Sequence, residues 1–249
     1  MVAYTAFSSL LFASLAVASP HKQSKPPAFF LAGDSTTAVQ STGGGGWGNG
    51  FLATLKSPAF GVNKGHNGAT TVSFVDGGDW KQVLDLVKNA TSKYDVYVTI
   101  QFGHNDQKPA KNITMEAFKA NLETLTGEVK QLGATPLLFT SLARRNFNGT
   151  DLKQDLADVV PATREAAAKA KVQLIDLNVA SRKYVQAIGQ ANADKYNLVE
   201  GDRTHLNDHG SVVFGRIVAD LLVKSDKNLG KWIEKNATLS RLIADGKYA

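Results

Sequence analysis

The sequence predicts an α/β protein in which a parallel sheet is covered by helices on both faces. Short apolar runs, which are typical of buried strands, alternate along the chain with longer segments whose apolar residues recur at helical spacing. Strands that alternate with helices favour parallel pairing. A chain of 249 residues with no internal repeat and no clear linker predicts a single domain with a substantial core.

The first half of the chain supplies three predicted strands and one helix. Residues 29–32 form an apolar run that stops at Gly33, which predicts a buried strand entering a tight loop. The elements that follow are a second strand ending in the loop 62–70, a helix marked by Trp80, Val83, Leu84 and Val87, and a buried strand over 95–102.

The second half continues the same alternation. Apolar residues from Phe118 to Leu132 predict a long amphipathic helix, and Gly133 is expected to end it because glycine adopts the backbone conformation found after many helices. The remaining predictions are a strand over 136–139, an alanine-rich helix over 162–171, a strand over 172–175, helices over 178–189 and 208–222, and terminal helices from Leu229 onward.

The amino terminus indicates export. Residues 10–18 are apolar or small and end in Ala16-Val17-Ala18, a pattern typical of signal-peptide cleavage. We therefore expect a signal peptide at 1–18 and a mature, secreted domain at 19–249. Four Asn-x-Ser/Thr sequons agree with secretion and predict glycosylation at Asn89, Asn112, Asn148 and Asn236.

Composition excludes several kinds of site. The chain has no cysteine, so disulfides, thiolate metal sites and a cysteine nucleophile are all excluded. The net charge of +6 comes from scattered lysines rather than a dense basic run, which favours a solvated surface over a nucleic-acid groove. The apolar stretch at the amino terminus is too short for a membrane span. We expect no nucleic-acid or membrane partner, and a monomer.

Three residues fit the chemistry of acyl transfer. Ser35 directly follows the first predicted strand, and ligands of parallel sheets bind outside the carboxyl ends of the strands. A serine hydroxyl becomes an effective nucleophile when a base takes its proton, and His205 can do so. The Asp-x-x-His spacing lets Asp202 hold the other ring nitrogen. The alternative is that Gly33-Asp34-Ser35 is only a turn before a helix cap.

Attack on a carbonyl creates an oxyanion that needs preorganised hydrogen-bond donors. The candidates are the backbone N–H groups of Ser35 and Gly68 and the side-chain amide of Asn105, each just after a predicted strand. A glycine at position 68 lets the backbone approach a substrate closely. Taken singly, Gly68 could be an ordinary turn residue and Asn105 a helix or turn cap. Their joint position at one predicted edge favours the oxyanion hole.

Two further patterns carry less weight. Gly43, Gly45 and Gly48 satisfy G-x-G-x-x-G, but they do not directly follow the strand and lack the later acidic residue of a dinucleotide site. We predict instead a mobile loop whose Trp47 is either a substrate contact or a core anchor. His205 and His209 stand four residues apart, but no third metal ligand is evident. We expect neither metal nor cofactor.

These blocks together resemble those of a known superfamily. Gly33-Asp34-Ser35, Gly68, Gly103-His104-Asn105-Asp106 and Asp202-x-x-His205 resemble the four blocks of SGNH (GDSL) hydrolases. The fuller Gly-Asp-Ser-Thr-Thr-Ala, Gly-Trp-Gly and Phe-Gly-His-Asn-Asp segments resemble those of the fungal rhamnogalacturonan acetylesterase family. The chain departs from that family in having no cysteine and in the residues that follow Gly68.

The resemblance implies both a fold and an activity. The implied fold is a three-layer α/β/α sandwich with a five-stranded parallel sheet. The implied triad is Ser35, Asp202 and His205, and the implied oxyanion hole is Ser35, Gly68 and Asn105. The implied activity is removal of acetyl groups from the rhamnogalacturonan backbone of pectin, without a cofactor. Acetylxylan or lipid esters, or a catalytically silent wall-binding protein, remain the alternatives.

Overall fold

The structure is a computed structural model that describes residues 1–2 and 25–249. Apart from its first two residues, the predicted signal peptide lies outside the described part of the chain. Among the described helices, none is both long and apolar enough to cross a lipid bilayer.

Five parallel strands form the central sheet, in the order β2-β1-β3-β4-β7. They are β1 (Pro27–Gly33), β2 (Phe60–Asn63), β3 (Asp95–Gln101), β4 (Thr135–Phe139) and β7 (Gln173–Ile175). Gly33 pairs with Gln101, so β1 and β3 end at the same level and the loops after them start side by side. The predicted five-stranded parallel sheet is confirmed.

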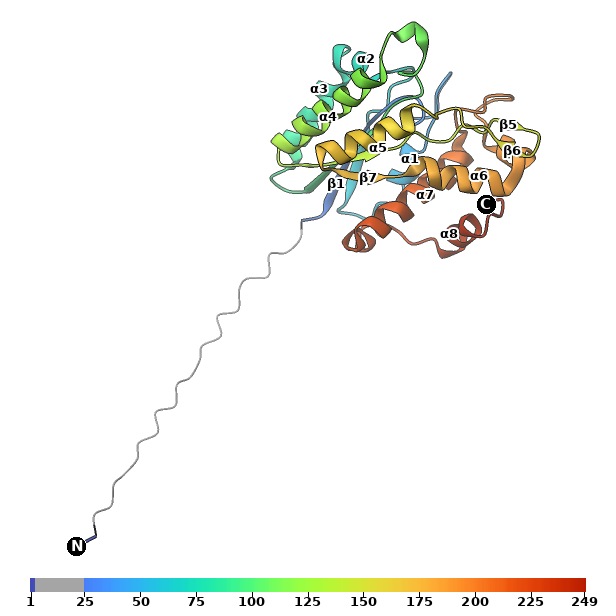
Figure 1. The fold of residues 1–249 in the computed structure, drawn as a ribbon. Coiled ribbons are helices and arrows are strands. Elements are labelled where there is room, and N and C mark those ends of the chain that lie inside the picture. Colours follow the sequence, from blue (N-terminus) through green and yellow to red (C-terminus); the bar gives the residue numbers. More distant parts are fainter. Residues whose placement is uncertain (3–24) are drawn as a thin grey trace.

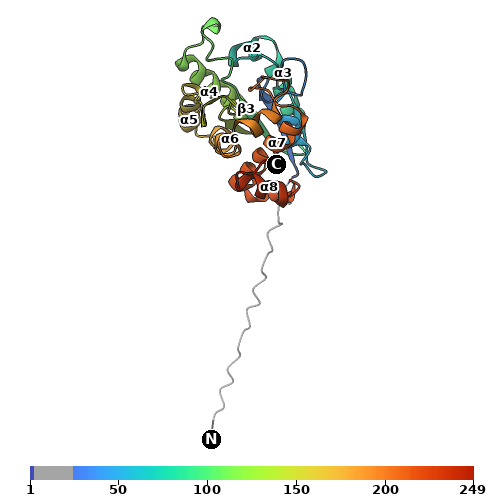
Figure 2. The same ribbon diagram turned by 90° about the vertical axis from the view of Figure 1, so that its right-hand side faces the viewer.

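Helices cover both faces of the sheet, as Figures 1 and 2 show. One layer contains α2 (Thr71–Asp76), α3 (Asp79–Ala90), α4 (Met115–Gln131) and α5 (Val159–Ala170). The other contains α1 (Gly48–Leu52), α6 (Leu177–Ala193), α7 (Asp208–Ser225) and α8 (Ala237–Ala244). Successive residues of β1 serve opposite cores: Phe30 packs with the first layer, and Phe29 and Leu31 pack with the second. The molecule is therefore the predicted three-layer sandwich.

Side-chain caps fix the starts of α4 and α7. The Thr114 side chain accepts a hydrogen bond from the Ala117 N–H and caps α4, which ends at Gln131 before Gly133 takes a positive φ of 73°. Asn207 caps α7 in the same way through the Gly210 N–H. The Asn207 cap fixes the start of α7 immediately after the loop that carries His205.

Several short elements were not predicted. They are α1, α2, the hairpin of β5 (Phe147–Asn148) and β6 (Asp151–Leu152), and the 3₁₀ turns η1 (Pro109–Lys111) and η2 (Asp194–Tyr196). The 3₁₀ turn η3 (Lys227–Lys231) overlaps the start of the predicted terminal helices. The longer elements match, although α5 begins at Val159 rather than at 162. Short elements contain too few residues to establish a period, and tertiary contacts decide them.

Candidate active site

Ser35 lies in the loop directly after β1. The loop is held by Asp34, whose Oδ1 accepts hydrogen bonds from the Thr36 N–H at 2.8 Å and the Thr36 hydroxyl at 2.7 Å. The Asp34 N–H donates to the Gln101 carbonyl, which ties this loop to the end of β3. Ser35 is 5% exposed, so its hydroxyl is largely shielded from solvent at the carboxyl edge of the sheet.

The structure brings Ser35, His205 and Asp202 together in one chain of hydrogen bonds. Ser35 Oγ lies 2.8 Å from His205 Nε2, although 170 positions separate them in the sequence. His205 Nδ1 lies 2.8 Å from Asp202 Oδ2. This is the nucleophile, base and orienting carboxylate geometry that acyl transfer requires.

The environment of Asp202 favours its charged form. Burial alone would raise the pKa of this carboxyl, but hydrogen bonds from the His205 N–H, the His205 ring and the Thr204 N–H outweigh burial and lower the pKa. Asp202 Oδ1 accepts both backbone bonds, at 3.0 Å from His205 N and 3.1 Å from Thr204 N. An ionised Asp202 is therefore able to hold the Nδ1 proton and stabilise an imidazolium.

The predicted oxyanion donors lie on neighbouring loops. His66 N–H donates to the Gly33 carbonyl, which places the loop of Gly68 against the loop of Ser35. Asn105 Nδ2 donates to the Ala69 carbonyl at 3.0 Å, which joins the loop after β3 to the loop of Gly68. Gly68 has a φ of 76°, a value that favours glycine.

Two of these donors are not used by the protein itself. Within residues 25–249, neither the Ser35 N–H nor the Gly68 N–H donates to a protein acceptor. Asn105 Nδ2 spends one of its two hydrogens on Ala69, and its Oδ1 accepts from Lys108 Nζ at 2.7 Å. Unused donors at this edge of the sheet are what a developing oxyanion would need.

The glycine run, residues 43–48, packs between two loops of the site, and its predicted mobility stays a prediction. Gly45 N donates to the Ser35 carbonyl at 3.0 Å, and Leu206 N donates to the Gly45 carbonyl at 2.8 Å. A Cβ on Gly45 would lie 2.7 Å from the Leu206 carbonyl oxygen, so only glycine fits between these loops. The run is therefore a packed bridge that joins the loop of Ser35 to the loop of His205.

Trp47 is a core anchor and not a substrate contact. Its side chain is fully buried, its ring stacks on Phe139 with a centroid distance of 5.3 Å, and its Nε1 donates to Gln101 Oε1 at 2.7 Å. Burial without access to solvent excludes the substrate-contact alternative. Gln101 in turn donates to the Thr36 hydroxyl, so Trp47 supports the loop of Ser35 through a buried polar chain.

Arg145 is a site residue that the sequence analysis missed. Its guanidinium is buried and donates through Nη2 to the Asp202 carbonyl at 3.1 Å and to the His205 carbonyl at 2.6 Å. Nε donates to Asn197 Oδ1 at 3.0 Å. Burial lowers the pKa of Arg145 to about 10, so the group stays charged at neutral pH. No feature of the Arg144-Arg145 pair distinguishes it from a surface pair in the sequence.

His104 and Asp34 form a second buried pair beside the site. His104 Nδ1 lies 3.6 Å from Asp34 Oδ2, and both side chains are almost fully buried. Burial would raise the pKa of Asp34, but His104 and the hydrogen bonds from Thr36 lower it. His104 therefore contacts the loop of Ser35 through Asp34. His209, which the sequence analysis considers with His205 as a metal ligand, packs against Tyr196 and Tyr248.

All four sequon asparagines, at positions 89, 112, 148 and 236, are exposed. The side chain of Asn236 also caps α8 through the Leu239 N–H. Glycosylation at these positions stays a prediction.

Comparison with known proteins gives the family. The model of the GDSL-like lipase/acylhydrolase family matches residues 31–213, from β1 into α7. The chain belongs to this family. Its members are carboxylic ester hydrolases, and the match spans Ser35, Gly68, Asn105, Asp202 and His205.

Two relatives of this GDSL-like chain come from Bacillus subtilis. One, described as a probable rhamnogalacturonan acetylesterase, is 31% identical over 210 residues, covering 81% of this chain and 93% of the relative. The other, a rhamnogalacturonan acetylesterase, is 29% identical over 213 residues, covering 79% and 89%. The crystal structure of a lipase/acylhydrolase from Enterococcus faecalis shares the fold, with a TM-score of 0.56 at 24% identity over 84% of this chain and 99% of that one.

Proposed function

We propose that this protein is a secreted serine esterase that removes acetyl groups from a plant cell-wall polysaccharide, the rhamnogalacturonan backbone of pectin. The hydrogen-bonded series Ser35–His205–Asp202, with both contacts at 2.8 Å, is the observation that carries the proposal. The rhamnogalacturonan acetylesterase names of its relatives support the choice of substrate.

The proposed reaction begins with the attack of Ser35 Oγ on the acetyl carbonyl carbon. His205 Nε2 takes the hydroxyl proton as the bond forms. The carbonyl oxygen becomes an oxyanion that accepts hydrogen bonds from the Ser35 N–H, the Gly68 N–H and Asn105 Nδ2. Collapse of this intermediate breaks the bond to the sugar oxygen, which receives the proton from His205.

Hydrolysis of the acetyl-enzyme completes the cycle. His205 takes a proton from water as the water attacks the acetyl carbon, and a second oxyanion forms in the same place. Its collapse releases acetate and returns the proton to Ser35. Asp202 stays ionised throughout and stabilises the imidazolium formed in each half of the cycle.

The variant Ser35→Ala tests this mechanism. We expect it to fold with the thermal midpoint of the wild type and to release acetate at least about 1,000-fold more slowly, because the nucleophile is absent. Acetate release is measured from acetylated rhamnogalacturonan, acetylated xylan and p-nitrophenyl acetate. Full activity of the variant would rule the mechanism out. Faster acetate release by the wild type from acetylated xylan than from acetylated rhamnogalacturonan would overturn the proposed substrate.

Labelling with a serine-directed fluorophosphonate separates an esterase from a silent wall-binding protein. An activated Ser35 should react, and Ser35→Ala should not. Ser41→Ala is the matched control, because Ser41 lies just before the glycine run and, within residues 25–249, its hydroxyl hydrogen-bonds only to Asn67 and the Val39 carbonyl. An unlabelled wild-type protein would favour the silent binder.

A further inference from the structure

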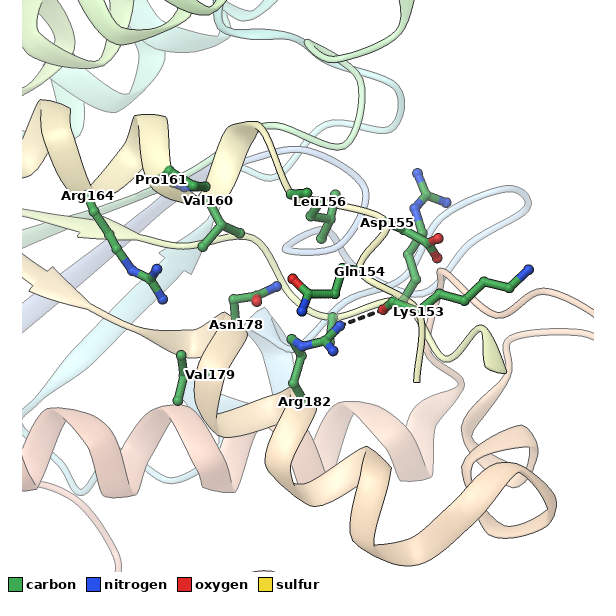
Figure 3. Close-up of a pocket in the computed structure, with 13 residues that line it drawn as sticks. Lys153, Gln154, Asp155, Leu156, Val160, Pro161, Arg164, Asn178, Val179 and Arg182 are labelled. Atoms are coloured by element: carbon green, nitrogen blue, oxygen red, sulfur yellow. Dashed lines mark hydrogen bonds between the residues drawn. The ribbon is translucent and has the colours of Figure 1, made fainter. Parts of the chain in front are cut away.

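A basic pocket lies beside the proposed active site. It has a volume of about 260 Å³ and is lined by segments that follow β4 and β7 at the carboxyl edge of the sheet. Four cationic side chains line it: Arg144, Lys153, Arg164 and Arg182. Figure 3 shows the Gln154 amide directed toward Asn178 and Arg182, with Val160 and Pro161 forming an apolar wall.

Arg182 is held in place without being neutralised. Its Nη2 donates to the Leu152 carbonyl at 3.1 Å, and its Nη1 donates to the Lys153 carbonyl at 2.5 Å, the bond drawn in Figure 3. Carbonyl partners orient a guanidinium but carry no charge. A guanidinium has five N–H donors, so others remain for a ligand. A fixed fork of this kind loses little conformational entropy on binding a carboxylate.

The other charges of the pocket leave it positive. Asp176 pairs with Arg164 at 2.8 Å, and the Asp155 carboxylate accepts a hydrogen bond from Asn146. Among the described residues, no carboxylate lies within ion-pair distance of Arg144, Lys153 or Arg182. Such a concentration of unpaired cations in a hollow favours an anionic ligand.

The pocket connects directly to the loop of the proposed base. Arg144 Nη1 donates to the hydroxyl of Thr204, the residue immediately before His205. Ser35 follows β1, while the pocket lies over β4 and β7, which stand two and three strand positions away in the sheet. A spacing of about 4.8 Å between strands puts the two roughly 10–15 Å apart along the edge. A polysaccharide lying along this edge would reach both.

We propose that this pocket binds the carboxylate of a uronic acid residue in the substrate chain, a few sugars from the acetyl group that is removed. The Arg182 fork takes the carboxylate, Lys153 adds charge at the rim, and Val160 and Pro161 contact the apolar face of the sugar ring. The inference rests on the proposed function for the presence of a polysaccharide at this edge. It makes the enzyme selective for acidic chains.

Direct binding tests the pocket without any turnover. A short oligogalacturonide is titrated calorimetrically into Ser35→Ala at low salt, with a neutral xylo-oligosaccharide of the same length as the comparison. We expect the acidic probe to bind more tightly and the double variant Ser35→Ala/Arg182→Gln to bind it about tenfold more weakly. Added salt should weaken the binding. Equal binding of the two probes, or unchanged binding by the double variant, would overturn the proposal.

Matched variants separate the pocket from general charge. Lys183→Gln removes the same charge from the next position of α6, outside this pocket, and should leave binding unchanged. If Arg182→Gln does not fold, Lys153→Gln decides instead, because the Lys153 side chain is exposed and bonds to nothing in the described part of the protein. We expect Lys153→Gln to weaken oligogalacturonide binding about threefold. Unchanged binding by this variant would overturn the proposed pocket.

Kinetics distinguishes the failure of this inference from the failure of the proposed function. For Arg182→Gln, the ratio of kcat/KM on acetylated rhamnogalacturonan to that on p-nitrophenyl acetate should fall about tenfold, through KM. If the wild-type protein cleaves no ester but binds oligogalacturonide through Arg182, the proposed function is overturned and the proposed pocket is supported. If the protein cleaves both esters and the ratio of the two kcat/KM values does not depend on Arg182, the proposed pocket is overturned and the proposed function is supported.

Discussion

At the scale of the residue, Arg145 shows how a charged side chain can support a site without facing the substrate. Its guanidinium bonds to the backbone carbonyls on either side of the Asp202–His205 turn. A buried charge is costly unless it is well bonded, and breaking such an arrangement typically costs about 3–5 kcal/mol. We infer that the buried Arg145 holds the turn in the conformation that places His205 Nε2 2.8 Å from Ser35 Oγ.

The variant Arg145→Met tests this positioning role. It keeps an unbranched side chain in the buried space but leaves two carbonyls without a donor, so we expect a loss of about 2–4 kcal/mol of unfolding free energy. We also expect kcat on p-nitrophenyl acetate to fall at least about tenfold with little change in KM, because the base is no longer held against the nucleophile. Chemical denaturation and steady-state kinetics measure the two effects.

Arg241→Met is the control for Arg145→Met, because Arg241 is exposed on α8 and bonds to nothing among residues 25–249. Arg145→Lys should restore part of the rate, since an ammonium can reach one carbonyl but cannot match the planar fork. A destabilised Arg145→Met protein with an unchanged kcat would show that Arg145 serves the fold alone.

The sequence predicts the proposed reacting groups better than the groups that hold them. Their positions, after predicted strands or before a predicted helix, and their specific chemistry predict from the sequence alone that Ser35, Asp202 and His205 lie close together. Arg145 carries no such mark, because burial of an arginine depends on which carbonyls the fold turns toward it. The sequence does not decide between the two roles of Trp47 for the same reason, since its partners Phe139 and Gln101 lie far away in the sequence.

At the scale of the element, the glycine run shows how close packing can replace secondary structure. A Cβ on Gly46 would overlap the carbonyl oxygen of Thr36, and one on Gly48 would overlap that of Thr37. Glycine composition is equally typical of mobile loops, so composition alone could not distinguish the two. The short helix α1 begins inside this run and includes two glycines, which is why helical spacing gave no indication of it.

The variant Gly46→Ala should disturb the loop of Ser35. The added methyl group must displace Thr36, whose carbonyl accepts a hydrogen bond from the Trp47 N–H at 3.1 Å. We expect a loss of about 1–3 kcal/mol in unfolding free energy and a marked fall in kcat. Gly127→Ala is the matched control: it lies inside α4 with no atom within 4 Å of the new Cβ, and it should stabilise the protein by about 0.5–1 kcal/mol. A Gly46→Ala protein as stable and active as the wild type would mean that the bridge is not tight.

At the scale of the whole molecule, stability at acid pH depends on carboxylates that the fold keeps charged. The pKa values of Asp34, Asp194 and Asp202 are lowered by their hydrogen-bond and ion-pair partners, which outweigh the opposing effect of burial. A carboxyl whose pKa is lower in the folded than in the unfolded state stabilises the fold above the unfolded pKa, and this contribution is lost as pH falls through the folded pKa. Burial raises the pKa of Asp106, which acts in the opposite sense.

The variant Asp194→Asn tests this linkage without changing a proposed catalytic residue. Asp194 accepts hydrogen bonds from Arg203, Asn197 and Gln190, and an asparagine keeps the shape but not the charge. We expect the variant to be less stable than the wild type at neutral pH, and the difference to shrink below about pH 4, the unfolded pKa of an aspartate, because the wild type then loses the same charge. Thermal midpoints between pH 3 and 7 measure it.

The control for Asp194→Asn is Glu200→Gln, which removes an exposed carboxylate that pairs with nothing in the described chain. Its difference from the wild type should stay small and constant over the same range. A constant gap for Asp194→Asn would mean that the Arg203 ion pair contributes nothing through its charge. If only the Asp194→Asn difference in thermal midpoint narrows at acid pH, the charge of Asp194 stabilises the fold through its ion pair with Arg203. Because Arg203 directly follows Asp202 in the chain, this ion pair would also hold the Asp202–His205 loop in place.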